Sequence, residues 1–121
     1  MSFSFNTYED FARRLKNSTN EVDLRNSVSR GYYNFYHKVK KLFGYLNNQY
    51  VRHEDLIAKL KNDERINKGA KLSNAMQVMK EEREYADYKV SPPIEFNKQF
   101  IEIFWRKYDN IIKLLEEEDI D

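Results

Sequence analysis

The chain has 121 residues, 34% of them charged and 40% hydrophobic, and its net charge of +1 alone points to no class of partner. Its length supports one domain with a real core, and the absence of cysteine excludes disulfides and thiolate zinc sites, so we expect no metal and no other cofactor. No apolar run approaches the roughly 20 residues of a membrane span and the N-terminus lacks a signal-peptide layout, so we expect a cytoplasmic protein without a membrane partner.

Helical periodicity runs through most of the chain, and no segment alternates as a strand would. Helices are expected over residues 7–16, 21–46, 53–61, 71–86 and 94–117. Between the last two, Pro92 and Pro93 exclude a continuous helix, because proline lacks the amide proton and restricts the residue before it. We therefore expect residues 1–121 to form a single all-α domain with a frayed acidic tail over 118–121.

Basic residues are concentrated in the middle of the chain. Residues 13–71 carry 14 Lys and Arg against 6 Asp and Glu, whereas the two ends together carry 7 against 14. A basic middle is expected of a protein that binds a polyanion such as RNA. An ordinary solvated helical surface accounts for the same counts, so both interpretations stay open.

The second expected helix carries Arg30 and His37, seven residues apart and therefore on nearly the same side. Its apolar side chains lie opposite, so His37 is not expected in the core. Tyr33 and Tyr36 argue against a merely wet surface, because tyrosine favours interfaces. A site, a dimer interface or both can use this side of the helix. The polar residues expected to support such a site or to contact RNA are Asn26, Tyr33, Asn34 and Lys41.

Arginine and histidine at this spacing suit the cleavage of RNA. Arginine clamps phosphate and histidine acts as an acid or base at neutral pH. RNA supplies its own nucleophile, the 2′-hydroxyl, so no metal is required and the product carries a 2′,3′-cyclic phosphate. One Arg30 and one His37 are too few for all the steps, but two of each, brought together by a two-fold axis, suffice.

Two motifs carry a resemblance to a known family. Residues 29–37, Ser-Arg-Gly-Tyr-Tyr-Asn-Phe-Tyr-His, resemble the signature helix of HEPN-domain proteins, in which four to six residues separate the arginine from the histidine. Residues 83–88, Arg-Glu-Tyr-Ala-Asp-Tyr, are similar to the Arg-x-x-Ala-Asp-Tyr that ends a later helix in many small members. There Arg83 and Asp87 have the spacing of a structural ion pair. The resemblance covers nearly the whole chain.

This resemblance implies an up-and-down bundle of four to five helices around one long central helix, dimerising so that two Arg-His motifs line one cleft. Many HEPN proteins are metal-independent endoribonucleases that act as toxins or in phage defence. By matching position, Arg30 would contact the phosphate and His37 would assist proton transfer. A homodimer, an RNA substrate and an antitoxin or nucleotidyltransferase partner are the expected associations.

Alternatives to an enzyme follow from the same resemblance, because other HEPN proteins are non-catalytic subunits that dock a partner such as a nucleotidyltransferase. Gly31 follows the arginine where catalytic members often carry Asn, Asp or His. Val39 stands where toxins silenced by nucleotide transfer carry Tyr, which argues against that control. The basic middle also leaves open an RNA binder without turnover. For His53, at the start of the third helix, a surface or capping role is expected.

Overall fold

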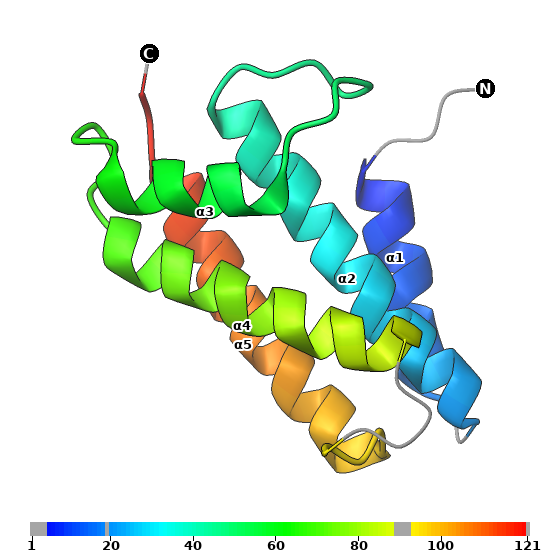
Figure 1. Cartoon of the computed structure of the whole chain (residues 1–121). Coiled ribbons are helices and arrows are strands. Elements are labelled where there is room, and N and C mark those ends of the chain that lie inside the picture. The colour runs from blue at the N-terminus through cyan, green and yellow to red at the C-terminus, as the bar shows by residue number, and fades with distance from the viewer. Residues whose placement is uncertain (1–4, 19, 89–92, 121) are drawn as a thin grey trace.

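The computed structural model describes residues 5–18, 20–88 and 93–120, and of residues 5–8 it describes the backbone alone. It contains five helices (Figure 1): α1 (Phe5–Leu15), α2 (Glu21–Leu42), α3 (His53–Asn62), α4 (Gly69–Tyr88) and α5 (Lys98–Glu116). No strand occurs in these described ranges, so the all-α prediction is confirmed. Over the same residues, no helix is both long and apolar enough to cross a membrane.

The helices form an up-and-down bundle in which α2 is the central element. α2 is the longest helix and contacts each of the other four. α1 and α4 run antiparallel to α2, whereas α5 runs in the same direction as α2 (Figure 1). The short α3 packs mainly on α4 and touches α2 at its own start. The expected architecture of one long central helix is therefore present.

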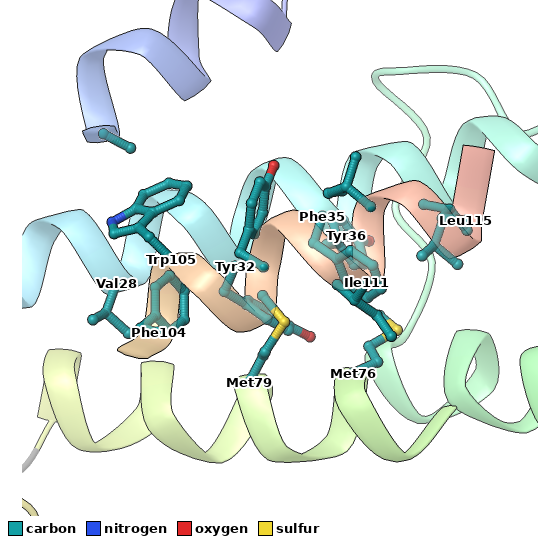
Figure 2. Packing of buried hydrophobic residues seen from close by; sticks show 14 of the residues in the cluster. Val28, Tyr32, Phe35, Tyr36, Met76, Met79, Phe104, Trp105, Ile111 and Leu115 are labelled. Carbon is teal, nitrogen blue, oxygen red and sulfur yellow. The ribbon is translucent and has the colours of Figure 1, made fainter. Parts of the chain in front are cut away.

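The core lies where α2, α4 and α5 meet (Figure 2). Its buried side chains recur at steps of three and four residues in each helix, as packing of a single helical face requires. Burying each large apolar side chain contributes roughly 1.5–3 kcal/mol. The largest fully buried members include Tyr32, Phe35, Phe104, Trp105 and Tyr108.

Local signals explain where α2 and α5 begin and end. The side chains of Asn20 and Asn97 accept hydrogen bonds from backbone amides of the first turns, at 2.8 Å in both helices, and so cap α2 and α5. α2 ends at Leu42 rather than at residue 46, because Gly44 adopts a left-handed conformation with φ +82°. The expected helices were therefore too long at the end of α2 and at the start of α5.

The C-terminal tail is held in place at Glu118, contrary to the expectation that it is frayed. Glu118 is buried, and its carboxylate accepts hydrogen bonds from the amides of Asn67 and Lys68, at 2.9 and 2.8 Å. These amides precede the first turn of α4, where a negative charge is favourable. Of the two prolines expected to interrupt the helices, Pro92 lies outside the described residues, and Pro93 lies between α4, which ends at Tyr88, and α5, so it belongs to neither helix.

Candidate functional site

One side of α2 remains outside the core and carries most of the residues that the sequence singled out. Asn26, Tyr33 and Lys41 are exposed there, and Arg30 and His37 are half-buried. We refer to these five residues as the α2 stripe. Tyr33 keeps 38% of its surface exposed and lies one turn from both Arg30 and His37. The stripe therefore joins a cationic group, a titratable imidazole and an accessible aromatic ring.

Helix α1 borders the α2 stripe at Arg30. The guanidinium of Arg30 lies 4.9 Å from the ring centroid of Phe11, which is itself 43% exposed. Such a cation–π contact orients the arginine and adds about 0.5–1 kcal/mol at a partly exposed position. Arg30 is thus held at the edge of the bundle, where a planar cation can meet a ligand.

His37 packs edge-to-face against Tyr36, with ring centroids 5.2 Å apart. Burial lowers the pKa of His37 below its usual value, and the nearby ammonium of Lys40 lowers that pKa further. A lowered pKa keeps the imidazole neutral at pH 7, because the charged form loses hydration and faces a like charge. A neutral imidazole can accept a proton from a reacting hydroxyl.

Asn34 does not lie on the α2 stripe, contrary to its expected place. Its side chain is buried, with 2% of the residue exposed, and its Nδ2 donates a hydrogen bond to the hydroxyl of Tyr108 on α5. The covered side of α2 is wider than its apolar residues indicate, because α1 and α5 pack there as well as α4. Asn34 therefore links helices and is not available to contact RNA.

Gly31 explains how α5 reaches this side of α2. A Cβ atom at Gly31 would lie 2.9 Å from Cε1 of Phe104 and 3.1 Å from Cη2 of Trp105. Carbon atoms do not pack at the first distance, so any side chain would push the two rings away. The glycine after Arg30 thus serves the close approach of two helices.

Tyr36 also differs from its expected role at an interface. It is buried, and its hydroxyl donates to the carbonyl of Val51 at 2.6 Å and accepts from the amide of Val51 at 3.2 Å. These bonds hold the segment before α3 against α2. Tyr36 is therefore part of the connection between two elements.

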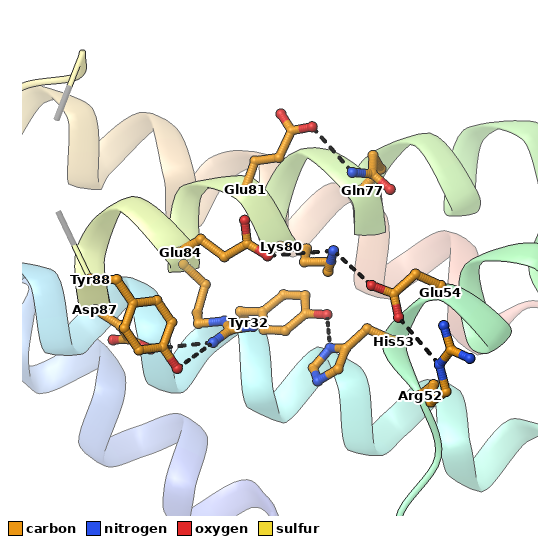
Figure 3. Close-up of polar contacts among 11 residues, drawn as sticks. Tyr32, Arg52, His53, Glu54, Gln77, Lys80, Glu81, Glu84, Asp87 and Tyr88 are labelled. Carbon is orange, nitrogen blue, oxygen red and sulfur yellow. Dashed lines mark hydrogen bonds and ion pairs between the residues drawn. The ribbon is translucent and has the colours of Figure 1, made fainter.

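His53 occupies a position that the sequence did not indicate. Arg52 is the residue that precedes the first turn of α3, so His53 is not its N-cap, and His53 is half-buried where it packs on α2. Its Nδ1 is hydrogen-bonded to the hydroxyl of Tyr32 (Figure 3), and its ring stacks on Tyr36 with centroids 4.5 Å apart. The ring also lies edge-to-face with Tyr33, at 6.2 Å. His53 therefore borders the α2 stripe from α3.

Arg83, on α4, packs against the rings of Tyr32 and Tyr33 next to this part of the α2 stripe. It is 6% exposed, forms an ion pair with Asp87 at 3.7 Å and donates a hydrogen bond to the hydroxyl of Tyr88 at 3.3 Å. Its guanidinium also lies within 5.6 Å of the ring centroids of Tyr32, Tyr33 and Tyr88. Asp87 in turn accepts from the hydroxyl of Ser29, so the pair ties α4 to α2.

The tertiary structure thus adds His53 and Arg83 to the surroundings of the α2 stripe and removes Asn34 from them. One weak signal in the sequence pointed to the position of His53. The expected second helix carries three tyrosines, and an imidazole from another helix can stack on such rings. Among the described residues, no three His, Cys, Asp or Glu side chains lie close enough to hold a metal ion. The groups present can bind a phosphodiester and move a proton.

Comparison of the chain with family models, with curated proteins and with solved structures finds no match in any of the three. The chemistry of the site is therefore to be inferred from its own residues.

Proposed function

We propose that the protein is a metal-independent endoribonuclease of the HEPN type, acting as a homodimer whose composite site takes Arg30 and His37 from both subunits. The observation that carries the proposal is the α2 stripe, where an oriented arginine and a neutral imidazole lie outside the core on one side of one helix. Exposed Tyr33 lies between them and offers a ring on which an unpaired base can stack.

The reaction needs only groups that this arrangement supplies. His37 of one subunit accepts the proton of the 2′-hydroxyl, and the 2′-oxygen attacks the adjacent phosphorus. The bond from phosphorus to the 5′-oxygen breaks, and His37 of the second subunit gives that oxygen a proton when it is in the protonated form, which its lowered pKa makes the minor form near pH 7. The two Arg30 guanidinium groups stabilise the negative charge on the phosphoryl oxygens. The products are a 2′,3′-cyclic phosphate and a 5′-hydroxyl.

A second subunit follows from this chemistry. One chain offers one imidazole on the stripe, whereas the reaction requires a base and an acid at the same time. A two-fold axis along α2 supplies both from identical residues. The exposed rings of Phe11 and Tyr33 beside Arg30 provide apolar surface for such a contact.

The decisive experiment is cleavage of single-stranded RNA in EDTA by the purified protein, with the ends of the products identified. Arg30→Ala and His37→Ala should each lower the rate about 10²–10⁴-fold, because each removes a group that acts in the transition state. Arg106→Ala is the matched control, since Arg106 is an exposed arginine on α5. Activity in His37→Ala equal to that of the wild type would refute the proposal.

The second candidate is a non-enzymatic subunit that docks a partner protein such as a nucleotidyltransferase. Exposed aromatic side chains favour it, since Phe11, Tyr33 and Tyr88 retain 43%, 38% and 70% exposure. In that case a partner co-purifies in fixed stoichiometry, Tyr33→Ser weakens the complex, and the dimer cuts no RNA. A role as a toxin or in phage defence belongs to the same proposals and is tested by growth arrest on expression of wild type against His37→Ala.

A further inference from the structure

Both histidines of the chain lie against the same tyrosine ring. The centroid of Tyr36 is 5.2 Å from that of His37 and 4.5 Å from that of His53. His37 comes from α2 and His53 from the first turn of α3, so the fold brings together two imidazoles that are separated in sequence. Tyr33, the exposed ring of the α2 stripe, also contacts His53. An RNA strand bound along the stripe would therefore pass beside His53.

We infer that the RNA site extends onto α3, where neutral His53 donates a hydrogen bond from Nε2 to a phosphate oxygen of the bound strand. This inference rests on the proposed function, because it presumes that RNA lies on the α2 stripe. It assigns His53 a phosphate-binding role that is separate from proton transfer at His37. The ligand class is the phosphodiester backbone of a single strand.

The hydrogen bond to Tyr32 determines which ring nitrogen of His53 carries the proton. Burial raises the pKa of Tyr32, so its hydroxyl keeps its proton and is able to donate a hydrogen bond. In the proposed site this hydroxyl is the donor to Nδ1 of His53. In a neutral imidazole the remaining proton then sits on Nε2. Figure 3 shows this second nitrogen pointing away from Tyr32. Tyr32 thus positions a hydrogen-bond donor.

Burial, together with the charges on α4, favours the neutral form of the His53 ring. Burial lowers the pKa of His53, and the cations of Arg83 and Lys80 on α4 lower it further, against the opposing carboxylates of Glu54 and Glu84. A neutral donor binds phosphate without itself undergoing a change of charge near pH 7. Arg83 is held by its ion pair with Asp87 and by tyrosine rings, so its own role is to position and to polarise.

A purely structural role would also account for the contacts of His53, since they hold the start of α3 to α2. His53→Phe separates the two roles, because it keeps a stacking ring and removes both nitrogens. Tyr32→Phe keeps the tyrosine ring and removes only the hydroxyl. The double variant Tyr32→Phe/His53→Phe removes both partners of the bond and so leaves neither group unsatisfied in a partly buried place.

The first test uses ¹⁵N NMR of the histidine side chains in the wild-type protein, with a 2′-O-methyl single-stranded RNA that cannot be cleaved. We expect the free protein to show His53 protonated at Nε2 and the RNA to shift that nitrogen. His53 with its proton on Nδ1, or a spectrum of His53 unchanged at saturating RNA, would overturn the inference. This readout does not depend on catalysis.

The second test is steady-state cleavage by variants whose thermal unfolding matches that of the wild type. His53→Phe and the double variant should raise KM about 10²-fold, as for loss of one hydrogen bond to a charged phosphate, with kcat changed less than about threefold. Tyr32→Phe should raise KM about tenfold, because the tautomer of His53 is no longer held. Full activity in the double variant, with His37→Ala inactive, refutes the role of His53 and leaves the proposed function standing. An inactive wild type refutes the proposed function, and the NMR result then decides on the phosphate contact alone.

Discussion

Two arginine–histidine pairs lie beside each other in this protein, and they arise in different ways. Arg30 and His37 belong to one helix and share a side of it because of their spacing. His53 and Arg83 come from α3 and α4 and meet because both pack around Tyr32. The first pair can be predicted from its spacing in the sequence, whereas the second pair forms only in the folded chain.

The surroundings of the two arginines differ as well. Arg83 is buried, is paired with Asp87 and lies against three tyrosine rings, so its charge is compensated within the protein. Arg30 is half-buried and rests on one partly exposed ring, that of Phe11. A cation compensated inside the fold supports structure, whereas a cation oriented at the surface can bind a ligand. The comparison therefore favours a structural role for Arg83, whereas the position of Arg30 suits the phosphate contact that we propose for it.

Replacing each arginine in turn should produce the largest difference between the pairs. Arg83→Met should lower the free energy of unfolding by about 1–2 kcal/mol, because it removes the ion pair with Asp87 and the contacts of the buried guanidinium with the rings of Tyr32 and Tyr33. Arg30→Met should cost less than about 1 kcal/mol, the size of a cation–π contact. Urea denaturation followed by circular dichroism measures both. Equal losses would contradict the division of roles.

A smaller effect is expected at Gly31, which controls how closely α5 approaches the helix that carries Arg30 and His37. Gly31→Ala should gain about 1 kcal/mol of helix propensity, but crowding against Phe104 costs about 1–3 kcal/mol, so a net loss of stability is expected. Phe104→Leu serves as the control. In the double variant Gly31→Ala/Phe104→Leu, the cost of the added methyl group should largely vanish, and strict additivity of the two changes would contradict this account.

The smallest expected effect is the contribution of the two histidines to the pH dependence of the unfolding free energy. Burial lowers the pKa of His37 and of His53 in the folded state. The unfolded chain therefore binds more protons below about pH 6.5, and the stability due to the neutral rings, complete above that pH, is lost as the pH falls toward the folded pKa values. His37→Gln and His53→Gln should each flatten the dependence of unfolding free energy on pH between 5 and 7. If the slope is unchanged in either variant, the pKa of the corresponding histidine is not lowered in the folded protein.

Helical periodicity in the sequence was enough to predict the helices, but not all of their ends. The cap Asn97 places the start of α5 at Lys98, whereas the periodic pattern alone had put it at residue 94. The end of α2 was placed too late, because the apolar Leu46 continues the periodic pattern past Gly44, which leaves the helix. The tail was expected to fray because it is acidic, yet Glu118 finds two backbone amides that are distant in sequence.

The sequence by itself determined that the protein is all-α and that Arg30 and His37 project from one side of a long helix. Both follow from the 3.6-residue repeat of the helix, which depends only on hydrogen bonds between near neighbours in the chain. Only the tertiary structure decided that Asn34 is covered and that His53 lies beside the stripe. Which polar side chains become buried depends on how many helices pack around α2, and a periodic pattern in one helix carries no information about the others.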